Sequence, residues 1–202
     1  MITFFFAGFE STSTTISSTI FELAHNQDAQ KKLQLEIDNF FAKNQSDIIE
    51  QYDDLKHLQY LDAVYKESLR KNPVVVRIER CLDTDNYKLD GIKLEKNTLI
   101  EIPTQALQLS DKYWPDPEKF QPERFLPENK DQIIPYTYLP FGDGPRNCVG
   151  MRFAITVVKV ALAHLIHKYS FDLAPETPKE LEYLRVRPIL QPKKYPLLLK
   201  KR

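Results

Sequence analysis

The chain has 202 residues, of which 42% are hydrophobic and 28% charged, and its formal net charge is zero at neutral pH. This is the composition of a globular protein long enough to bury a core, and the balanced charge gives no indication of a nucleic-acid partner. The two cysteines, Cys81 and Cys148, lie too far apart to suggest a disulfide framework, which fits a reducing, cytosol-facing environment. We find no signal-peptide pattern and no apolar run of bilayer-spanning length.

The first predicted element is a helix over residues 3–24, which is so rich in apolar residues that we expect it to be buried. Eight of the nine residues 11–19 carry hydroxyl groups, which can donate hydrogen bonds back to helix carbonyls. Ala7 and Gly8 make the helix thin near its middle, at a cost of about 1 kcal/mol for the glycine. These features are typical of a kinked, tightly packed helix, but the segment also places Glu10 beside the hydroxyl of Ser11.

Two further helices are predicted before the strands. Residues 28–43 have apolar side chains at helical spacing among charges, and residues 55–72 continue the same pattern until Pro73 ends it. The second helix contains Glu67 and Arg70, three residues apart, which on spacing alone would be a surface ion pair contributing under about 1 kcal/mol.

A β segment follows, with short strands expected over residues 77–82, 87–89 and 98–103 and a turn at Asp90-Gly91. We expect Cys81 to be a free cysteine packed in the first of these strands. The next segment, residues 114–125, is rich in proline and ends in Pro-Glu-Arg-Phe.

Three of the five glycines of the chain lie in residues 141–150, around Cys148. Such a density of glycine marks backbone that turns tightly or is approached closely. Cys148 also precedes a predicted helix, whose positive N-terminus, together with Arg146, favours a thiolate. The motif offers neither a paired histidine nor a second cysteine at zinc-ligand spacing, which leaves two interpretations: an axial ligand of haem iron, or a structural turn with a buried cysteine.

The last helix is predicted over residues 151–167, which are apolar nearly all round and therefore indicate a buried element. The tail from residue 169 to residue 202 contains prolines and short apolar patches, as is typical of irregular strands and turns.

The cysteine stretch resembles the haem-binding loop of the cytochrome P450 superfamily, F-G-x-G-x-R-x-C-x-G, and fills every fixed position of that pattern. Three further motifs of the family precede it, in the order in which the family has them. Residues 7–12 resemble its A-G-x-[DE]-T oxygen-binding groove, residues 67–70 its E-x-x-R motif, and residues 114–125 the segment that ends in P-E-R-F.

The resemblance implies a mainly α fold with a small β component. It covers essentially the whole chain but only the C-terminal part of the family's sequence. We therefore expect residues 1–202 to be the C-terminal portion of a single cytochrome P450 domain, a fragment without the family's N-terminal part and membrane anchor.

The resemblance also implies a haem b site, that is, iron protoporphyrin IX. Cys148 would be the iron ligand, Phe141 and Arg146 would bind the cofactor within the loop, and Arg80 would reach a haem propionate. The alternative interpretation of Arg80 is a solvated strand arginine.

Glu10 and Ser11 would be the catalytic pair that relays protons to bound oxygen. Ser11 stands where the family usually has Thr. Thr12 could be considered instead, but its side chain is rotated by about 100° around the helix, so we prefer Ser11.

Two arginines would join one glutamate behind the haem. The family has a Glu–Arg–Arg network that holds the cysteine loop against the core. The matching residues of this chain are Glu67, Arg70 and Arg124.

The activity implied is that of a haem-thiolate monooxygenase, which inserts one atom of dioxygen into an apolar small molecule. NADPH would supply electrons through a cytochrome P450 reductase, at the cytosolic face of the endoplasmic reticulum membrane, the microsomal location. The motifs look most like the animal branch that handles xenobiotics, insect members included. Only Phe9 and residues 74–77 and 187–192 correspond to substrate-facing regions of the family.

Two alternatives stay open. One is a haem-thiolate isomerase or lyase, although such relatives typically lose the acid–hydroxyl pair. The other is a truncated, non-catalytic chain that does not hold haem.

Overall fold

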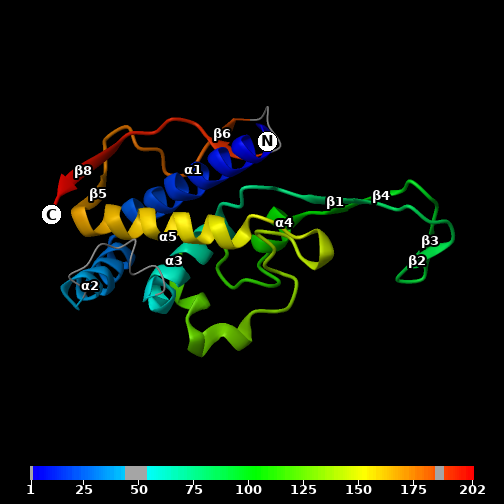
Figure 1. Cartoon of the computed structure of the whole chain (residues 1–202), viewed down its shortest axis with the longest axis horizontal. Coiled ribbons are helices and arrows are strands. Elements are labelled where there is room, and N and C mark those ends of the chain that lie inside the picture. The colour runs from blue at the N-terminus through cyan, green and yellow to red at the C-terminus, as the bar shows by residue number, and fades with distance from the viewer. Residues whose placement is uncertain (1, 44–53, 185–188) are drawn as a thin grey trace.

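The computed structural model describes residues 2–43, 54–184 and 189–202. Four long helices, α1 (Ile2–His25), α2 (Gln27–Lys43), α3 (Gln59–Lys71) and α5 (Met151–Lys168), form the body of the molecule, and a short helix, α4 (Thr104–Gln108), lies beside them (Figure 1). Single-turn or two-turn 3₁₀ helices occur at Asp54–His57, Pro122–Phe125, Pro127–Gln132 and Gly144–Arg146. No helix in the described part of the chain is long and apolar enough to cross a bilayer.

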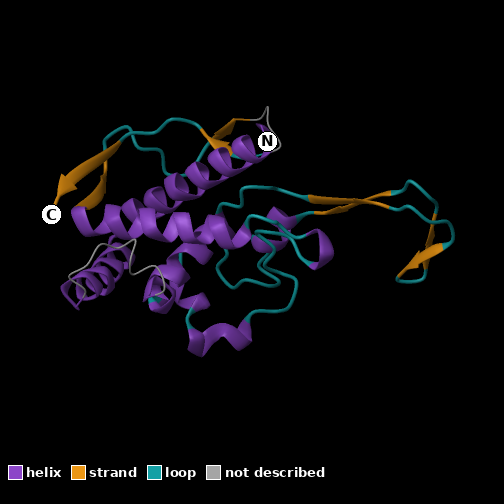
Figure 2. Ribbon diagram, in the orientation of Figure 1, coloured by secondary structure: helices purple, strands orange, loops and turns teal. Residues whose placement is uncertain are grey.

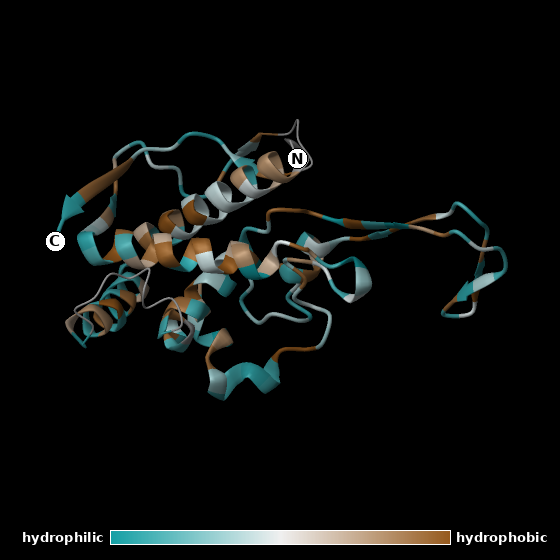
Figure 3. Cartoon of the chain, in the orientation of Figure 1, coloured by the Kyte–Doolittle hydropathy of each residue, from teal (hydrophilic) through white to brown (hydrophobic). Residues whose placement is uncertain are grey.

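The core forms where the second half of α1 meets α2, α3 and α5. Each of these helices contributes side chains with no exposed surface, and apolar colour runs along the same stretches in Figure 3. These fully buried residues are Leu23, Leu33, Ile37, Leu61, Val64, Leu162 and Ile166. Since they recur three or four residues apart within α2, α3 and α5, the amphipathic pattern of the sequence determines which face each helix buries.

The strands pair as antiparallel two-stranded ribbons (Figure 2). The ribbon of β1 (Ile78–Cys81) with β4 (Leu99–Ile102) extends from the helical body, and at its far end β2 (Tyr87–Leu89) pairs with β3 (Ile92–Leu94). Asp90 and Gly91, with φ of +49° and +80°, make the tight turn between β2 and β3. Near the chain's end, β5 (Tyr169–Leu173) pairs with β8 (Leu197–Lys201), and β6 (Tyr183–Leu184) pairs with β7 (Gln191–Pro192).

The predicted mainly α fold with a small β component is confirmed, as is the turn at Asp90-Gly91. The helix expected over residues 55–72 is wrong as a single element, because a 3₁₀ helix ends at His57 and α3 begins at Gln59. The strand β3 and the helix α4 were not predicted.

Three burial predictions for these elements are wrong. The start of α5, which was predicted to be buried, exposes Phe153, because the other helices cover only the part of α5 from Val158 onward. The first half of α1 is exposed, including Phe4, Phe5, Phe6 and Phe9, because α2, α3 and α5 cover only its second half. Cys81 is free and lies in a strand as expected, but it is exposed, because the alternate residues Ile78 and Arg80 face the other way.

Candidate functional site

The cysteine loop between residues 141 and 150 closes on itself through backbone hydrogen bonds. The Cys148 N–H donates to the Phe141 carbonyl at 2.9 Å, and the Met151 N–H donates to the Cys148 carbonyl at 3.3 Å. Gly142 and Gly144 have φ of +72° and +74°, a backbone conformation that residues with a Cβ rarely adopt, so the turn requires these two glycines. The loop leaves the Cys148 thiol exposed.

The loop leads directly into α5. Gly150 is the N-cap residue of this helix, so Cys148 lies two residues before the cap. The free N–H groups at a helix start carry a partial positive charge, and the exposed guanidinium of Arg146 adds a full one. The geometry therefore presents one soft sulfur ligand in an electropositive setting.

Strand β1 lies against this loop. A Cβ placed on Gly142 would be 3.5 Å from Ile78 Cδ1, and Arg80 is on the same face of the strand as Ile78. The Arg80 guanidinium donates to the Glu79 carbonyl at 2.8 Å. Arg77 pairs with Glu79 and Glu101, whereas within the described residues neither Arg80 nor Arg146 forms an ion pair with a carboxylate. The structure thus brings Arg80 to the loop that carries Arg146 and Cys148.

The predicted acid–hydroxyl pair lies on α1, at the border between its exposed and buried halves. Glu10 and Ser11 are both half-buried, and the Ser11 hydroxyl donates to the carbonyl of Ala7 one turn earlier. The hydroxyls of Thr15 and Thr19 make the same bond back to the preceding turn, as the sequence predicts for this helix.

Apolar side chains are exposed where α1 and α5 separate. The two helices pack together further along and diverge toward their N-termini (Figure 1). At the diverging ends, Phe9 is 65% exposed on α1, while Val149 and Phe153 are 86% and 72% exposed beside Cys148. This end of the molecule thus combines a thiol, exposed apolar side chains and two guanidiniums that have no carboxylate partner among the described residues. Such a set suits a flat, apolar group that has acidic substituents and a metal at its centre.

Behind the loop, Glu67, Arg70 and Arg124 form the expected network. Arg70 donates from Nε and Nη2 to the two Glu67 oxygens at 2.8 and 2.9 Å, and Arg124 Nε lies 3.5 Å from Glu67 Oε1. The side chains of Glu67 and Arg70 have no exposed surface, so the interpretation of this pair as a surface ion pair is wrong. Burial raises the pKa of the Glu67 carboxyl, although Arg70, the Gln121 N–H and Arg124 all act to lower it.

Two of the three segments that correspond to substrate-facing regions meet in the structure. The Leu190 N–H donates to the Val74 carbonyl at 2.9 Å, which brings the segment around residue 190 to the end of α3. Residues 187 and 188 lie outside the described residues. Phe9, the third expected contact, is on the exposed half of α1.

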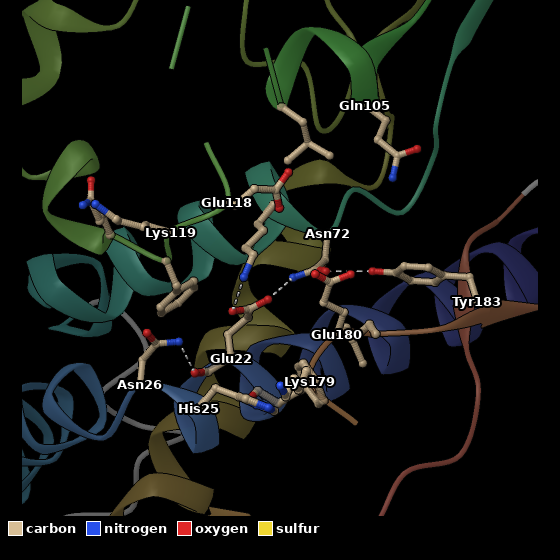
Figure 4. A pocket seen from close by; sticks show the side chains of 16 residues that line it. Glu22, His25, Asn26, Asn72, Gln105, Glu118, Lys119, Lys179, Glu180 and Tyr183 are labelled. Carbon is tan, nitrogen blue, oxygen red and sulfur yellow. Dashed lines mark hydrogen bonds and ion pairs between the residues drawn. The ribbon is translucent and has the colours of Figure 1, made fainter. Parts of the chain in front are cut away.

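A separate polar cavity of about 600 Å³ contains none of the predicted site residues (Figure 4). On its floor, the buried Glu22 carboxylate accepts from Lys71 Nζ at 3.0 Å and from Asn72 Nδ2 at 2.8 Å, and the Tyr183 hydroxyl donates to Asn72 Oδ1. Because none of the predicted site residues lines it, we do not take this cavity as the candidate site.

Sequence reasoning missed Gln108, which connects the network to the cysteine loop. This fully buried side chain donates to the carbonyls of Leu69 and Arg70, each at 3.0 Å, and accepts from the Leu139 N–H at 2.9 Å. An uncharged residue in a short, unpredicted helix carries no sequence signal for such a role.

Comparisons with known proteins agree with the cysteine motif. The cytochrome P450 family model matches residues 1–199. The chain is 46% identical to cytochrome P450 3A12 of Canis lupus familiaris and 47% identical to cytochrome P450 3A9 of Rattus norvegicus, in each case over 98% of this chain and 38% of the relative. Cytochrome P450 3A13 of Mus musculus is 46% identical over the same shares.

These mammalian relatives agree with the expected resemblance to an animal branch, and the chain spans less than two fifths of their length. The family model matches nearly the whole chain, and the relatives are more than 40% identical to it. The chain belongs to the cytochrome P450 family.

Proposed function

We propose that this chain supplies the cysteine-ligand side of a haem-thiolate monooxygenase. The observation that carries the proposal is the geometry of Cys148, whose exposed thiol is presented by a self-closed glycine loop at the start of α5. Membership of the cytochrome P450 family supports the same assignment.

In this proposal Cys148 binds the iron of haem b, and Arg80 and Arg146 bind its two propionates. The two arginines suit that role because each is free of a carboxylate partner among the described residues and both belong to segments that touch at Gly142. Phe141 contributes the carbonyl that closes the loop. Haem ligated by a thiolate supplies the chemistry of dioxygen activation.

The exposed apolar side chains near Cys148 would then cover the faces of the bound group and exclude water from the sulfur. Val149 and Phe153 would do so from the cysteine side and Phe9 from α1. Water exclusion matters because a thiolate in a drier setting interacts more strongly with its positive surroundings.

Glu10 and Ser11 are proposed to deliver protons on the α1 side. A carboxyl next to a hydroxyl can pass a proton to an acceptor beyond the helix, provided that the hydroxyl can leave its bond to the Ala7 carbonyl. An isomerase or lyase needs no such delivery, so the pair favours the monooxygenase.

The remaining parts of the proposal rest on the family resemblance. The substrate is an apolar small molecule of the xenobiotic kind, and the electrons come from NADPH through a cytochrome P450 reductase. The location proposed is the cytosolic face of the endoplasmic reticulum membrane.

The test is the visible spectrum of the holoprotein with Cys148 replaced. We expect Cys148→His to abolish the red-shifted Soret band of the reduced carbon-monoxide complex, because imidazole replaces the thiolate. Cys81→Ser is the matched control, since Cys81 is the other free, exposed cysteine, and it should leave the band unchanged. A red-shifted band in the Cys148→His protein would disprove the assignment.

A further inference from the structure

The buried face of α5 contains a lysine. Lys159 is only 8% exposed and lies at helical spacing from Ile155, Leu162 and Ile166, which belong to the apolar core or pack against it. Taking an ammonium group out of water costs several kcal/mol unless it is paired, so a lysine at this position requires a partner.

The partner is Asp62 on α3. Lys159 Nζ lies 2.5 Å from Asp62 Oδ1, while the other oxygen of the same carboxylate accepts from Lys66, one turn along α3, also at 2.5 Å. The Lys66 side chain is 38% exposed and stays within α3, whereas Lys159 crosses from one helix to the other. Burial acts to raise the pKa of Asp62, but the hydrogen bonds from Lys159 and Lys66 outweigh it and lower that pKa.

The Lys159–Asp62 pair specifies the position of one helix along the other more sharply than apolar packing does. Contacts among Leu, Ile and Val side chains are non-directional, so each one specifies the register of two helices less sharply than an ion pair does. An ion pair at hydrogen-bond distance is lost after a small slide. The ion pair between Lys159 and Asp62 therefore favours one position of α5 along α3.

The position of α5 matters because the cysteine loop is continuous with its first turn. Lys159 comes eight residues after Met151, which is roughly 12 Å along the helix axis. The segment that leads into the loop is held by α3, because Arg70 and Gln108 bond each other and Gln108 accepts from the Leu139 N–H. A slide of α5 would thus pull Cys148 away from a segment that α3 keeps in place.

We infer that Lys159 is a positioning residue for Cys148. Through its ion pair with Asp62, it fixes the position of α5 along α3. The effect on an iron ligand depends on the proposed function of Cys148. The position of α5 along α3 does not depend on it and can be tested separately.

The test compares Lys159→Met, the double variant Asp62→Asn/Lys159→Met, and Lys66→Met in the holoprotein. Methionine keeps the volume of the lysine stem, and Lys66→Met is the matched control because it removes a lysine from the same carboxylate without touching α5. The readouts are amide hydrogen exchange at Cys148 and Met151, unfolding in urea, and the Soret band of the reduced carbon-monoxide complex.

We expect Lys159→Met to be destabilised, because it leaves a partly buried Asp62 with one partner. Replacing both charges should restore the urea midpoint, since an apolar or neutral substitute for a buried ion pair is often neutral for stability. In the double variant the two loop amides should nevertheless exchange about tenfold faster than in the wild type, and more of the protein should lose the red-shifted band on warming. Lys66→Met should leave both loop amides unchanged.

Wild-type exchange rates at Cys148 and Met151 in the stable double variant would overturn the inference, because the pair would then act on stability alone. A wild-type protein without the red-shifted band would instead refute the proposed function. The comparison of amide exchange rates would still show whether the ion pair fixes the position of α5 along α3. If Lys159→Met does not fold, the exchange rates of the double variant are compared with those of the wild type and of Lys66→Met.

Discussion

Glu67 is a fully buried carboxylate whose oxygens are both occupied. Oε2 accepts from Arg70, while Oε1 accepts from Arg70 and from the Gln121 N–H at 2.9 Å and lies near Arg124. The arginines in turn donate to backbone carbonyls, Arg70 to Gln108 and Pro117 and Arg124 to Pro115. One side chain thus organises the segment 115–121, which has little regular structure of its own.

Removal of this carboxylate should therefore destabilise the protein strongly. Glu67→Ala would leave the buried Arg70 guanidinium without its counter-charge, at a cost of about 3–5 kcal/mol. We expect haem incorporation to fall sharply and the urea midpoint to drop. Lys32→Ala is the control, since it breaks the exposed Lys32–Glu123 pair, for which a loss under about 1 kcal/mol is expected. Equal haem content in the Glu67→Ala and wild-type proteins would show that the network is dispensable.

At the scale of elements, sequence periodicity predicted the long helices well. Residues 3–24, 28–43 and 151–167 match α1, α2 and α5 closely because each carries a sustained apolar pattern. The pattern of residues 55–72 gave no sign of the break at Leu58, because the Asp54–His57 turn and α3 place their apolar residues on one continuous face.

The short strands β1, β2 and β4 were predicted, whereas the short helix α4 was not, for a different reason. Helix α4 has only five residues, too few to be stable by propensity, and it is held by tertiary bonds such as that from the Thr104 hydroxyl to the Val75 carbonyl. The cysteine loop was predictable because glycine is needed at the positive φ of residues 142 and 144, and glycines at such density are visible in the sequence. The contacts of Gln108 and the Asp62–Lys159 ion pair depend on which helices pack together. The pattern of a single sequence does not show which helices do so.

The end of the chain is tied to the helical body by Asp38 on α2. Its carboxylate accepts from Arg202 and from His167, and Arg202 Nη1 also donates to the Ile166 carbonyl at 2.9 Å. Burial acts to raise the pKa of Asp38, but the hydrogen bonds from Arg202 and His167 outweigh it and hold the pKa below its usual range.

Acid should release this end of the chain first. Since the pKa of Asp38 is lowered on folding, its contribution to stability is complete above about pH 4 and is lost as the pH falls through the lowered value. We expect amide exchange in β8 to accelerate over that range before exchange in the core of α3 does. Asp38→Asn should show the faster β8 exchange already at neutral pH and little further change with acid. A β8 that stays protected in Asp38→Asn would mean that strand pairing with β5 alone holds it.

At the scale of the whole molecule, the apolar surface is unevenly distributed. The end of the helical body where α1, α2, α3 and α5 meet is densely packed, while the opposite end exposes Phe4, Phe5, Phe6 and Phe9 on α1 and Phe153 on α5. The ribbon of β1 and β4, with β2 and β3 at its tip, also extends away from the body (Figure 1). Contiguous apolar patches and open strand edges of this kind promote association.

We therefore predict that this polypeptide, expressed by itself as 202 residues, associates rather than remaining monomeric. Exposed apolar surface costs about 25 cal/mol per Å², so several hundred Å² around these phenylalanines amounts to several kcal/mol, much of a domain's margin of about 5–15 kcal/mol. Replacing Phe4, Phe5 and Phe6 with Ser should reduce association, as measured by sedimentation velocity, whereas Leu23→Ser in the packed half should unfold the chain. A wild-type polypeptide that sediments as a monomer and melts cooperatively would show that its exposed phenylalanines are covered by a rearrangement of α1.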